Sequence, residues 1–315
     1  MSEAVIRARG LTRRFGDFVA VQGLDLEVAP GEVFGLLGAN GAGKTTAIRM
    51  LCGTLPVTSG EISVAGVDML RHARKARSRI GYVTQRFTLY GDLSVQENLA
   101  LQAGLYGVPV ARAGERIAWA LERFGLREAG DLRAARLPLG HQRRLAIAAA
   151  LLHEPGVLFL DEPTSGIDPL ARQQLWELLY ELAAGGIGVL VTTHYMDEAL
   201  FCDRLALMER GVVIATGTPD ELLARPLASE PLEIHAGGAA ASGAWLAARE
   251  GVREVLPRAG RHRVRLAPLT DRAAWAERAA REAGADGLAL QIDLAPPREL
   301  EDVVVALLEE HGARA

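Results

Sequence analysis

Nine consecutive residues have the types and spacing that bind phosphate. The string GANGAGKTT follows the pattern G-x-x-x-x-G-K-[ST] and comprises Gly38, Ala39, Asn40, Gly41, Ala42, Gly43, Lys44, Thr45 and Thr46. Glycines let backbone N–H groups close around phosphates, and the start of a following helix adds positive potential. We expect Lys44 to contact the terminal phosphates, Thr45 to bind Mg²⁺ and Thr46 to add a phosphate contact. The pattern therefore predicts a site for ATP and Mg²⁺, the alternative being an ordinary glycine-rich turn.

Two acidic residues and a histidine follow short apolar runs further along the chain. Asp161 ends the run VLFLD and Glu162 comes next, so we expect Asp161 to act on Mg²⁺ through a bound water and Glu162 to serve as general base. The alternative for Glu162 is a solvated loop acid. His194 ends the run VLVTTH. Because the strand ends of one α/β sheet converge on one crevice, His194 should reach the γ-phosphate beside Glu162, unless it is structural.

The surrounding patterns predict the elements that hold these residues. Residues 1 to about 30 alternate apolar and polar, which is typical of half-buried strands and indicates an antiparallel lobe. From Val33 the run FGLLG, the glycine-rich turn and AIRMLCGTL read as strand, loop and helix. VLFLD and VLVTTH flank a helical stretch from Leu170 to Ala184, as parallel strands joined by a crossover helix would. The core is therefore predicted to be an α/β sheet.

A helical insertion and a separate C-terminal unit complete the predicted organisation. Residues Gln85 to Leu152 read as mostly helical, with Ser94 and Glu97 spaced as a capping box. The proline-containing segment from Pro219 to Glu230 marks a domain boundary. We expect a domain at 1–225, with a helical subdomain at about 86–150, and an accessory domain at 226–315.

The accessory domain has the pattern of a small α+β fold. Residues 231 to 294 read as strand, helix, strand, strand, helix, strand, the order of a ferredoxin-like unit, and PPRELEDVVVALLEEHG reads as an amphipathic helix. The pattern shows no catalytic constellation. We interpret His235, His262 and His311 as surface or packing residues rather than metal ligands.

Composition excludes several classes of protein. The 315 residues are 49% hydrophobic, enough for a substantial core, and the net charge of −4 predicts no general attraction to nucleic acid or anionic lipid. Cys52 and Cys202 lack a metal-ligand spacing and fit a reducing compartment such as the cytosol. The N-terminus does not read as a secretory signal. The most apolar stretch, Leu145 to Leu160, is interrupted well before the roughly 18 apolar residues of a membrane helix, so we expect no membrane span.

Taken together, the motifs over roughly residues 4 to 225 resemble the nucleotide-binding subunit of an ABC transporter. GANGAGKT resembles the Walker A motif, Gln85 in GYVTQ the Q-loop, VLFLDE the Walker B motif, SGID with Asp168 the D-loop, and His194 in TTH the switch histidine. The resemblance implies a P-loop NTPase fold with a RecA-like core, an antiparallel β lobe and a helical subdomain. It also implies catalytic roles for Lys44, Gln85, Glu162 and His194, and Mg²⁺ contacts from Thr45, Gln85 and Asp161. Phe15 in RRFGD matches the aromatic residue that stacks on adenine, unless it is a core phenylalanine.

The family signature, usually LSGGQ, is altered here. Leu137, Pro138, Leu139, Gly140 and His141 stand in its place. Pro138 has neither a hydroxyl nor an N–H, but Gly140 can still approach the nucleotide bound by the opposite subunit. The altered segment resembles that of ABC-2 type export subunits, as do FTLYGDLSVQENL, TTHYMDEAL and the C-terminal extension. The resemblance therefore favours an exporter of the drug-resistance type.

The resemblance implies an ATPase that forms a head-to-tail homo- or heterodimer and drives an integral membrane permease from the inner face of the membrane. The region from Gln85 to about Leu99 would contact the cytoplasmic coupling helix of the permease, unless it is merely an exposed loop. The C-terminal domain would serve a dimer contact or regulation. Three alternatives stay open: an ABC ATPase acting on ribosomes or DNA, a small-molecule kinase, and a catalytically idle regulatory subunit. The first usually has two cassettes or a long coiled-coil insertion, and the second would not explain Asp168 and His194.

Overall fold

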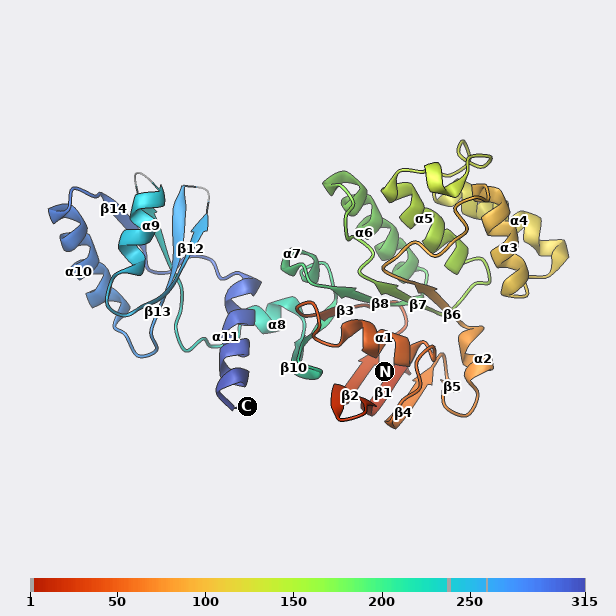
Figure 1. Cartoon of the computed structure of the whole chain (residues 1–315), viewed down its shortest axis with the longest axis horizontal. Helices are drawn as coiled ribbons and strands as arrows, with labels where there is room; N and C mark the ends of the chain where they lie inside the picture. The colour runs from red at the N-terminus through yellow and green to blue at the C-terminus, as the bar shows by residue number, and fades with distance from the viewer. Residues whose placement is uncertain (1–2, 237–238, 259, 315) are drawn as a thin grey trace. The chain divides into compact units, whose positions relative to one another are not determined.

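The computed structural model describes residues 3–236, 239–258 and 260–314, which form two compact units (Figure 1). The first unit is Met1–Pro219 and the second is Asp220–Ala315. The division lies at the start of the proline-containing boundary segment rather than after residue 225.

An antiparallel sheet forms the N-terminal lobe of the first unit. Its strand order is β2-β1-β4-β5, with bounds β1 Ile6–Phe15, β2 Phe18–Val28, β4 Ser59–Val64 and β5 Val67–Asp68. Ile6, Ala8 and Leu11 of β1 are fully buried, whereas Arg9 and Gly10 between them are exposed. One face of the sheet is therefore apolar, and the predicted antiparallel lobe is confirmed.

A six-stranded sheet lies at the centre of the first unit, in the order β10-β9-β3-β8-β7-β6. The strands are β3 Val33–Leu37, β6 Ile80–Val83, β7 Val157–Asp161, β8 Gly188–Thr193, β9 Arg204–Glu209 and β10 Val212–Gly217. All neighbours are parallel except β9 and β10. Every residue of β3, β7 and β8 is buried, which explains their continuous apolar runs.

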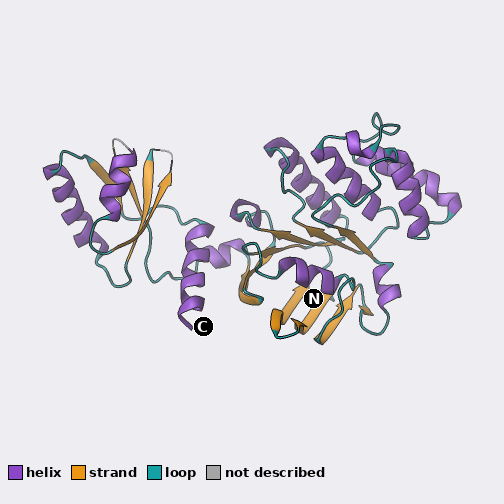
Figure 2. Ribbon diagram, viewed as in Figure 1, coloured by secondary structure: helices purple, strands orange, loops and turns teal. Residues whose placement is uncertain are grey.

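Helices cover both faces of this central sheet (Figure 2). Helix α1, Lys44–Leu51, packs with Val157 and Phe159 of β7 on one face, while α5, Leu139–Ala150, and α6, Pro169–Ala184, pack with Leu158 on the other. Helix α6 also connects β7 to its parallel neighbour β8. The predicted strand, loop and helix around the glycine-rich string and the predicted crossover are both confirmed.

A helical subdomain is inserted between β6 and β7. It contains α3 Val95–Leu105, α4 Val110–Arg123, the 3₁₀ helix η1 Ala134–Arg136, and α5. The predicted capping box opens α3, because the Glu97 amide donates to Ser94 Oγ at 3.1 Å and the Ser94 amide donates to Glu97 Oε2 at 2.7 Å. Short helices elsewhere are α2 Ala73–Arg77, α7 Met196–Ala199 and α8 Pro219–Leu223. None of the helices that the structure describes combines the length and apolar character needed to span a lipid bilayer.

The second unit has the predicted ferredoxin-like order of elements. Its sheet is antiparallel in the order β12-β13-β11-β14. The elements are β11 Leu232–Ala236, α9 Ala239–Ala247, β12 Val252–Arg258, β13 Arg261–Leu266, α10 Arg272–Ala285, β14 Leu290–Asp293 and α11 Leu300–Arg314. Strand β14 therefore pairs with β11, and β12 lies at the opposite edge beside β13.

The two faces of the second sheet differ in chemistry. Leu232, Ile234 and Val264 pack with Trp275 of α10 in an apolar core. On the other face, the buried guanidinium of Arg263 donates to both carboxylate oxygens of Asp302, with Nε 2.8 Å from Oδ1. This buried ion pair joins the sheet to the first turn of α11.

His262 and His235 are a packing and a surface residue, as expected, and His311 of α11 is partly exposed. His262 is buried with its Nε2 2.9 Å from Ser242 Oγ, and His235 is exposed with its Nε2 3.3 Å from Glu233 Oε1.

Candidate nucleotide-binding site

The glycine-rich loop joins β3 to α1, and its glycines are required by close contacts. A Cβ at Gly38 would lie 2.3 Å from the Met208 carbonyl oxygen, and one at Gly43 would lie 2.7 Å from the Ala20 carbonyl oxygen. Gly41 and Gly43 have φ values of 85° and 106°, in the region that favours glycine. Gly43 is also the N-cap of α1 and makes no side-chain capping bond. The loop is therefore a glycine cradle at a helix N-terminus, the arrangement that accommodates phosphate.

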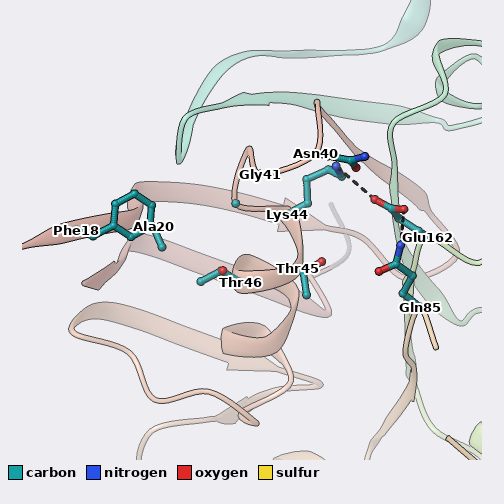
Figure 3. Close-up of a pocket in the computed structure, with 10 residues that line it drawn as sticks. Phe18, Ala20, Asn40, Gly41, Lys44, Thr45, Thr46, Gln85 and Glu162 are labelled. Carbon is teal, nitrogen blue, oxygen red and sulfur yellow. Dashed lines mark hydrogen bonds and ion pairs between the residues drawn. The ribbon is translucent and has the colours of Figure 1, made fainter. Parts of the chain in front are cut away.

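A cavity of about 350 Å³ opens beside this loop (Figure 3). Its lining residues are Phe18, Ala20, Asn40, Gly41, Gly43, Lys44, Thr45, Thr46, Gln85 and Glu162. In Figure 3, Lys44 and Gln85 approach Glu162 at one end, while Phe18 and Ala20 lie toward the other. The other expected nucleotide contacts, namely Phe15, Gly38, Ala39, Ala42 and Gly140, are not among the lining residues.

The Lys44 side chain contacts the glycine-rich loop. Its Nζ donates to the carbonyl oxygens of Gly38 at 2.8 Å and Ala39 at 3.1 Å, and lies 3.5 Å from Glu162 Oε1. Burial lowers the pKa of the Lys44 ammonium, while Glu162 and Asp161 oppose that shift. A phosphate in the cradle would add further negative charge beside this buried ammonium.

Asp161 and Thr45 come together from β7 and α1. Asp161 Oδ1 accepts hydrogen bonds from Thr45 Oγ1 at 3.1 Å and from Thr192 Oγ1 at 2.8 Å. Burial raises the pKa of the Asp161 carboxyl, and the two hydroxyls act in the opposite direction. Hydroxyl and carboxylate oxygens are ligands that suit Mg²⁺, so this pair fits the expected metal. Thr192 was not predicted as a site residue, although it stands in the same TTH string as His194.

Glu162 gathers three of the predicted catalytic side chains. Its Oε1 faces Lys44, and its Oε2 accepts a hydrogen bond from Gln85 Nε2 at 3.0 Å and lies 3.3 Å from His194 Nδ1. Glu162 has φ of 47°, an uncommon left-handed conformation for a non-glycine residue, and its amide donates to Thr192 Oγ1 at 3.0 Å. This backbone conformation turns a strand-end carboxylate toward the loop. The Mg²⁺ contact expected of Gln85 stays a prediction.

Two aromatic residues lie at the β1–β2 hairpin, and only one of them lines the cavity. Phe18 lines the cavity, whereas Phe15, its partner across the hairpin, is 46% exposed and has the Arg13 guanidinium 4.4 Å from its ring centroid. Adenine stacking on Phe15 stays a prediction. The string RRFGDF contained a second aromatic that could have drawn attention to Phe18.

The altered signature lies at the start of α5. Pro138 is the N-cap with extended backbone, and Gly140 lies in the first turn. A Cβ at Gly140 would lie 3.1 Å from the Cβ of Ala171 on α6, so the two helices approach closely here. Asp168 caps α6 by accepting a hydrogen bond from the Ala171 amide at 3.0 Å. Contact between Gly140 and the nucleotide of an opposite subunit stays a prediction.

The chain is similar to known proteins. Residues 21–165 match the family model described as ABC transporter. The chain is 48% identical over 223 residues to the probable multidrug ABC transporter ATP-binding protein YbhF of Escherichia coli strain K12, covering 71% of this chain but only 39% of that protein. It is 43% identical to the Nod factor export ATP-binding protein I of Paraburkholderia xenovorans strain LB400, covering 74% of this chain and 77% of that protein.

Solved structures show the same fold. The ATP-binding subunit of an ABC transporter superposes with a TM-score of 0.64 at 30% identity, covering 69% of this chain and 91% of that one. The ATP-binding cassette MJ0796, solved as a dimer in a post-hydrolysis state with ADP and Pi, superposes with a TM-score of 0.62 at 25% identity and covers 68% of this chain and 98% of that one. The extent of these matches and the geometry around Glu162 lead to one conclusion: this chain belongs to the ATP-binding proteins of ABC transporters.

Proposed function

We propose that this chain binds and hydrolyses ATP and powers export through a separate integral membrane permease. The observation that carries the proposal is the position of Glu162, whose carboxylate contacts Lys44, Gln85 and His194 at the edge of the glycine cradle. A lone carboxylate after a strand would have little meaning. One surrounded by an amide, an imidazole and a buried ammonium, beside a phosphate loop, has the surroundings of a general base.

The residues divide the reaction between holding phosphate and activating water. Lys44 and the loop amides would bind the phosphates, and Mg²⁺, held by Thr45 and through a bound water by Asp161, would neutralise phosphate charge. Glu162 would accept the proton of the attacking water at a carboxylate oxygen. Gln85 and His194 would orient that carboxylate and the water beside it.

The relatives support an exporter that works as a dimer. The Escherichia coli protein is named for multidrug transport, the Paraburkholderia protein for Nod factor export, and DrrA3 of Streptomyces coeruleorubidus, 44% identical over 71% of each chain, for daunorubicin resistance. MJ0796 was solved as a dimer. We infer a homo- or heterodimer bound to its permease at the inner face of the membrane, with Gly140 facing the partner's nucleotide and the region from Gln85 to Leu99 contacting the permease. The second unit would serve dimer contact or regulation.

Substitution of the general base tests the ATPase function. Glu162→Gln should retain ATP binding and lower turnover by about 10² to 10⁴, the range typical of losing a general base. Glu177→Gln, an exposed change on α6, is the matched control and should hydrolyse ATP at the parent rate. ATP hydrolysis and binding of a fluorescent ATP analogue are measured for all three proteins. Undiminished hydrolysis in Glu162→Gln would remove this residue from catalysis.

Purification from membranes tests the transport function. The tagged chain, expressed at its natural level, should bring down an integral membrane protein, to be identified by mass spectrometry. Addition of that protein in vesicles should alter the ATPase rate. Recovery of ribosomes instead would contradict the transport function and favour an ABC ATPase that acts in translation.

A further inference from the structure

A buried carboxylate beside the His194 turn takes no part in the mechanism above. Glu198, in α7, is 0% exposed. Its Oε2 accepts a hydrogen bond from Thr193 Oγ1 at 2.7 Å, and its Oε1 lies 3.4 Å from Nε of Arg172 on α6. Burying an ionised carboxylate costs free energy of folding unless it is paired with a cation, so the contact with Arg172 is important for keeping Glu198 in this place.

Thr193 connects this carboxylate to the residues around the nucleotide site. Its hydroxyl, besides donating to Glu198, accepts a hydrogen bond from the Tyr195 amide at 3.0 Å. Its carbonyl oxygen accepts from the amide of Gly38, in the phosphate loop, at 3.3 Å. Thr193, on one side of His194, therefore fixes the backbone of Tyr195 on the other side and is itself oriented by Glu198.

Arg172 reaches the same turn from the beginning of α6. Besides Glu198, its guanidinium contacts Asp197 Oδ2 at 3.4 Å and lies 5.0 Å from the ring centroid of Tyr195. The Tyr195 ring in turn lies 4.0 Å from the His194 ring. Arg172 also follows Asp168 by one helical turn, and its amide donates to the Asp168 carbonyl oxygen at 2.9 Å.

We propose that Glu198 and Arg172 are positioning residues that hold His194 at Glu162 and tie it to the start of α6. Neither residue touches the reacting atoms. Together they set the backbone turn from which His194 Nδ1 reaches to 3.3 Å from Glu162 Oε2. This inference rests on the proposed ATPase function and deepens it, because it makes the histidine sensitive to movement of the Asp168 segment.

The kinetic test replaces a carboxylate by an amide at Glu198 and, as a control, at a second residue that contacts the same guanidinium. Glu198→Gln keeps the shape and an acceptor oxygen, whereas Asp197→Asn alters the 68% exposed carboxylate that also contacts Arg172. Glu198→Gln should lower kcat about 10-fold to 100-fold through misplacement of His194, with KM and nucleotide affinity within about twofold of the parent. Asp197→Asn should change neither. Equal kcat in the two variants overturns the proposal. A fall in kcat of Glu198→Gln that comes with an equally large change in KM and with lower thermal stability also overturns it.

A double variant separates positioning from general destabilisation. Arg172→Met alone leaves the Glu198 carboxylate without its cation, and its kcat should fall in the same direction. The combination of Arg172→Met with Glu198→Gln should be no slower than the slower single variant, because both act through one pair. Multiplied losses would show independent actions and contradict the proposal. Arg172→Lys, which keeps the charge, should recover part of kcat.

A spectroscopic readout distinguishes failure of this inference from failure of the proposed function. Nuclear magnetic resonance of protein labelled with ¹⁵N-histidine reports on the His194 ring nitrogens, whose resonances are assigned by their loss in His194→Ala. These resonances should shift in Glu198→Gln and stay unchanged in Asp197→Asn. This measurement needs no hydrolysis. If the parent chain hydrolyses no ATP, the proposed function fails while the nuclear magnetic resonance comparison still decides on positioning. Unchanged His194 resonances in Glu198→Gln overturn the inference whatever the ATPase rate.

Discussion

Gly43→Ala should be the most informative single-methyl change in the phosphate loop. Gly43 combines φ of 106° with close neighbours, because an added Cβ would lie 2.7 Å from the Ala20 carbonyl oxygen, 2.8 Å from Met208 Cε and 3.4 Å from Gly211 Cα. The methionine methyl can move at little cost. The Ala20 carbonyl belongs to the backbone of β2, which is far less free to move than a side-chain methyl, so we expect the loop itself to shift.

The expected magnitude has two parts. A left-handed conformation at a non-glycine residue costs about 1–2 kcal/mol, and overpacking against a fixed neighbour costs about 1–3 kcal/mol. Gly41→Ala supplies a matched control in the same loop, because Gly41 has φ of 85° and an added Cβ there would meet no described atom within 4 Å. Gly43→Ala should therefore lower the free energy of unfolding of the first unit by about 1–3 kcal/mol more than Gly41→Ala.

Hydrogen exchange of the β7 amides measures this difference within the first unit alone. Exchange from Val157–Asp161, a fully buried central strand, reports opening of that unit without interference from the second. Binding of a fluorescent ATP analogue should weaken more in Gly43→Ala than in Gly41→Ala, since the displaced loop carries the phosphate contacts. Equal destabilisation by the two variants would refute the argument that close packing, and not backbone conformation alone, requires glycine at this position.

Three further predictions concern Asp161, Asp302 and Gly140. Burial raises the folded-state pKa of Asp161 above 3.8, so the stability contributed by its protonated form is lost as pH rises through that raised value. Without nucleotide, Asp161→Asn should therefore resist urea better than the parent at pH 7. It should lose this advantage below pH 3.8. Asp302→Ala should lower the unfolding free energy of the second unit by about 3–5 kcal/mol, measured by hydrogen exchange in β13, whereas Arg263→Met combined with Asp302→Leu should recover most of it. Gly140→Asp should impair ATPase activity and ATP-induced dimerisation, assayed with the permease, far more than Pro138→Ser does. A carboxylate at this position would repel phosphate, and the added Cβ would lie 3.1 Å from the Ala171 methyl group on α6. Normal activity in Gly140→Asp would mean that this segment does not face nucleotide.

Local patterns were sufficient for part of the fold, whereas β4, β5, β9 and β10 were not predicted. Continuous apolar runs predicted β3, β7 and β8 because these strands are buried on both faces, and alternation predicted the lobe because its sheet has one apolar face. The capping box at Ser94 and the order of elements in the second unit were also readable, since caps and strand–helix alternation depend on residues close in the chain. Strand–helix alternation also predicted the parallel pairing of β7 and β8 and the ferredoxin-like order of the second unit.

Motif spacing and the family resemblance together identified the residues that the chain brings together at the nucleotide site. Lys44, Asp161, Glu162 and His194 come from separate segments and were recognised by type and local context, whereas Gln85 was assigned through the family resemblance. Their convergence follows from a general property of parallel sheets, whose carboxyl ends share one edge. Distances and partners did not follow: that Gln85 donates to Glu162, for example, depends on the path of the segment after β6.

The amino-acid sequence by itself predicted the phosphate loop and a candidate general base and indicated the family, because each of these depends on residue types at short spacings. Only the tertiary structure placed Phe18 rather than Phe15 against the cavity, joined Thr192 to Asp161, and connected Arg172 to Glu198. Such contacts join residues that no local pattern relates, since they are set by how strands pair and helices pack. The partner of a buried carboxylate such as Glu198 is therefore known only from the folded structure.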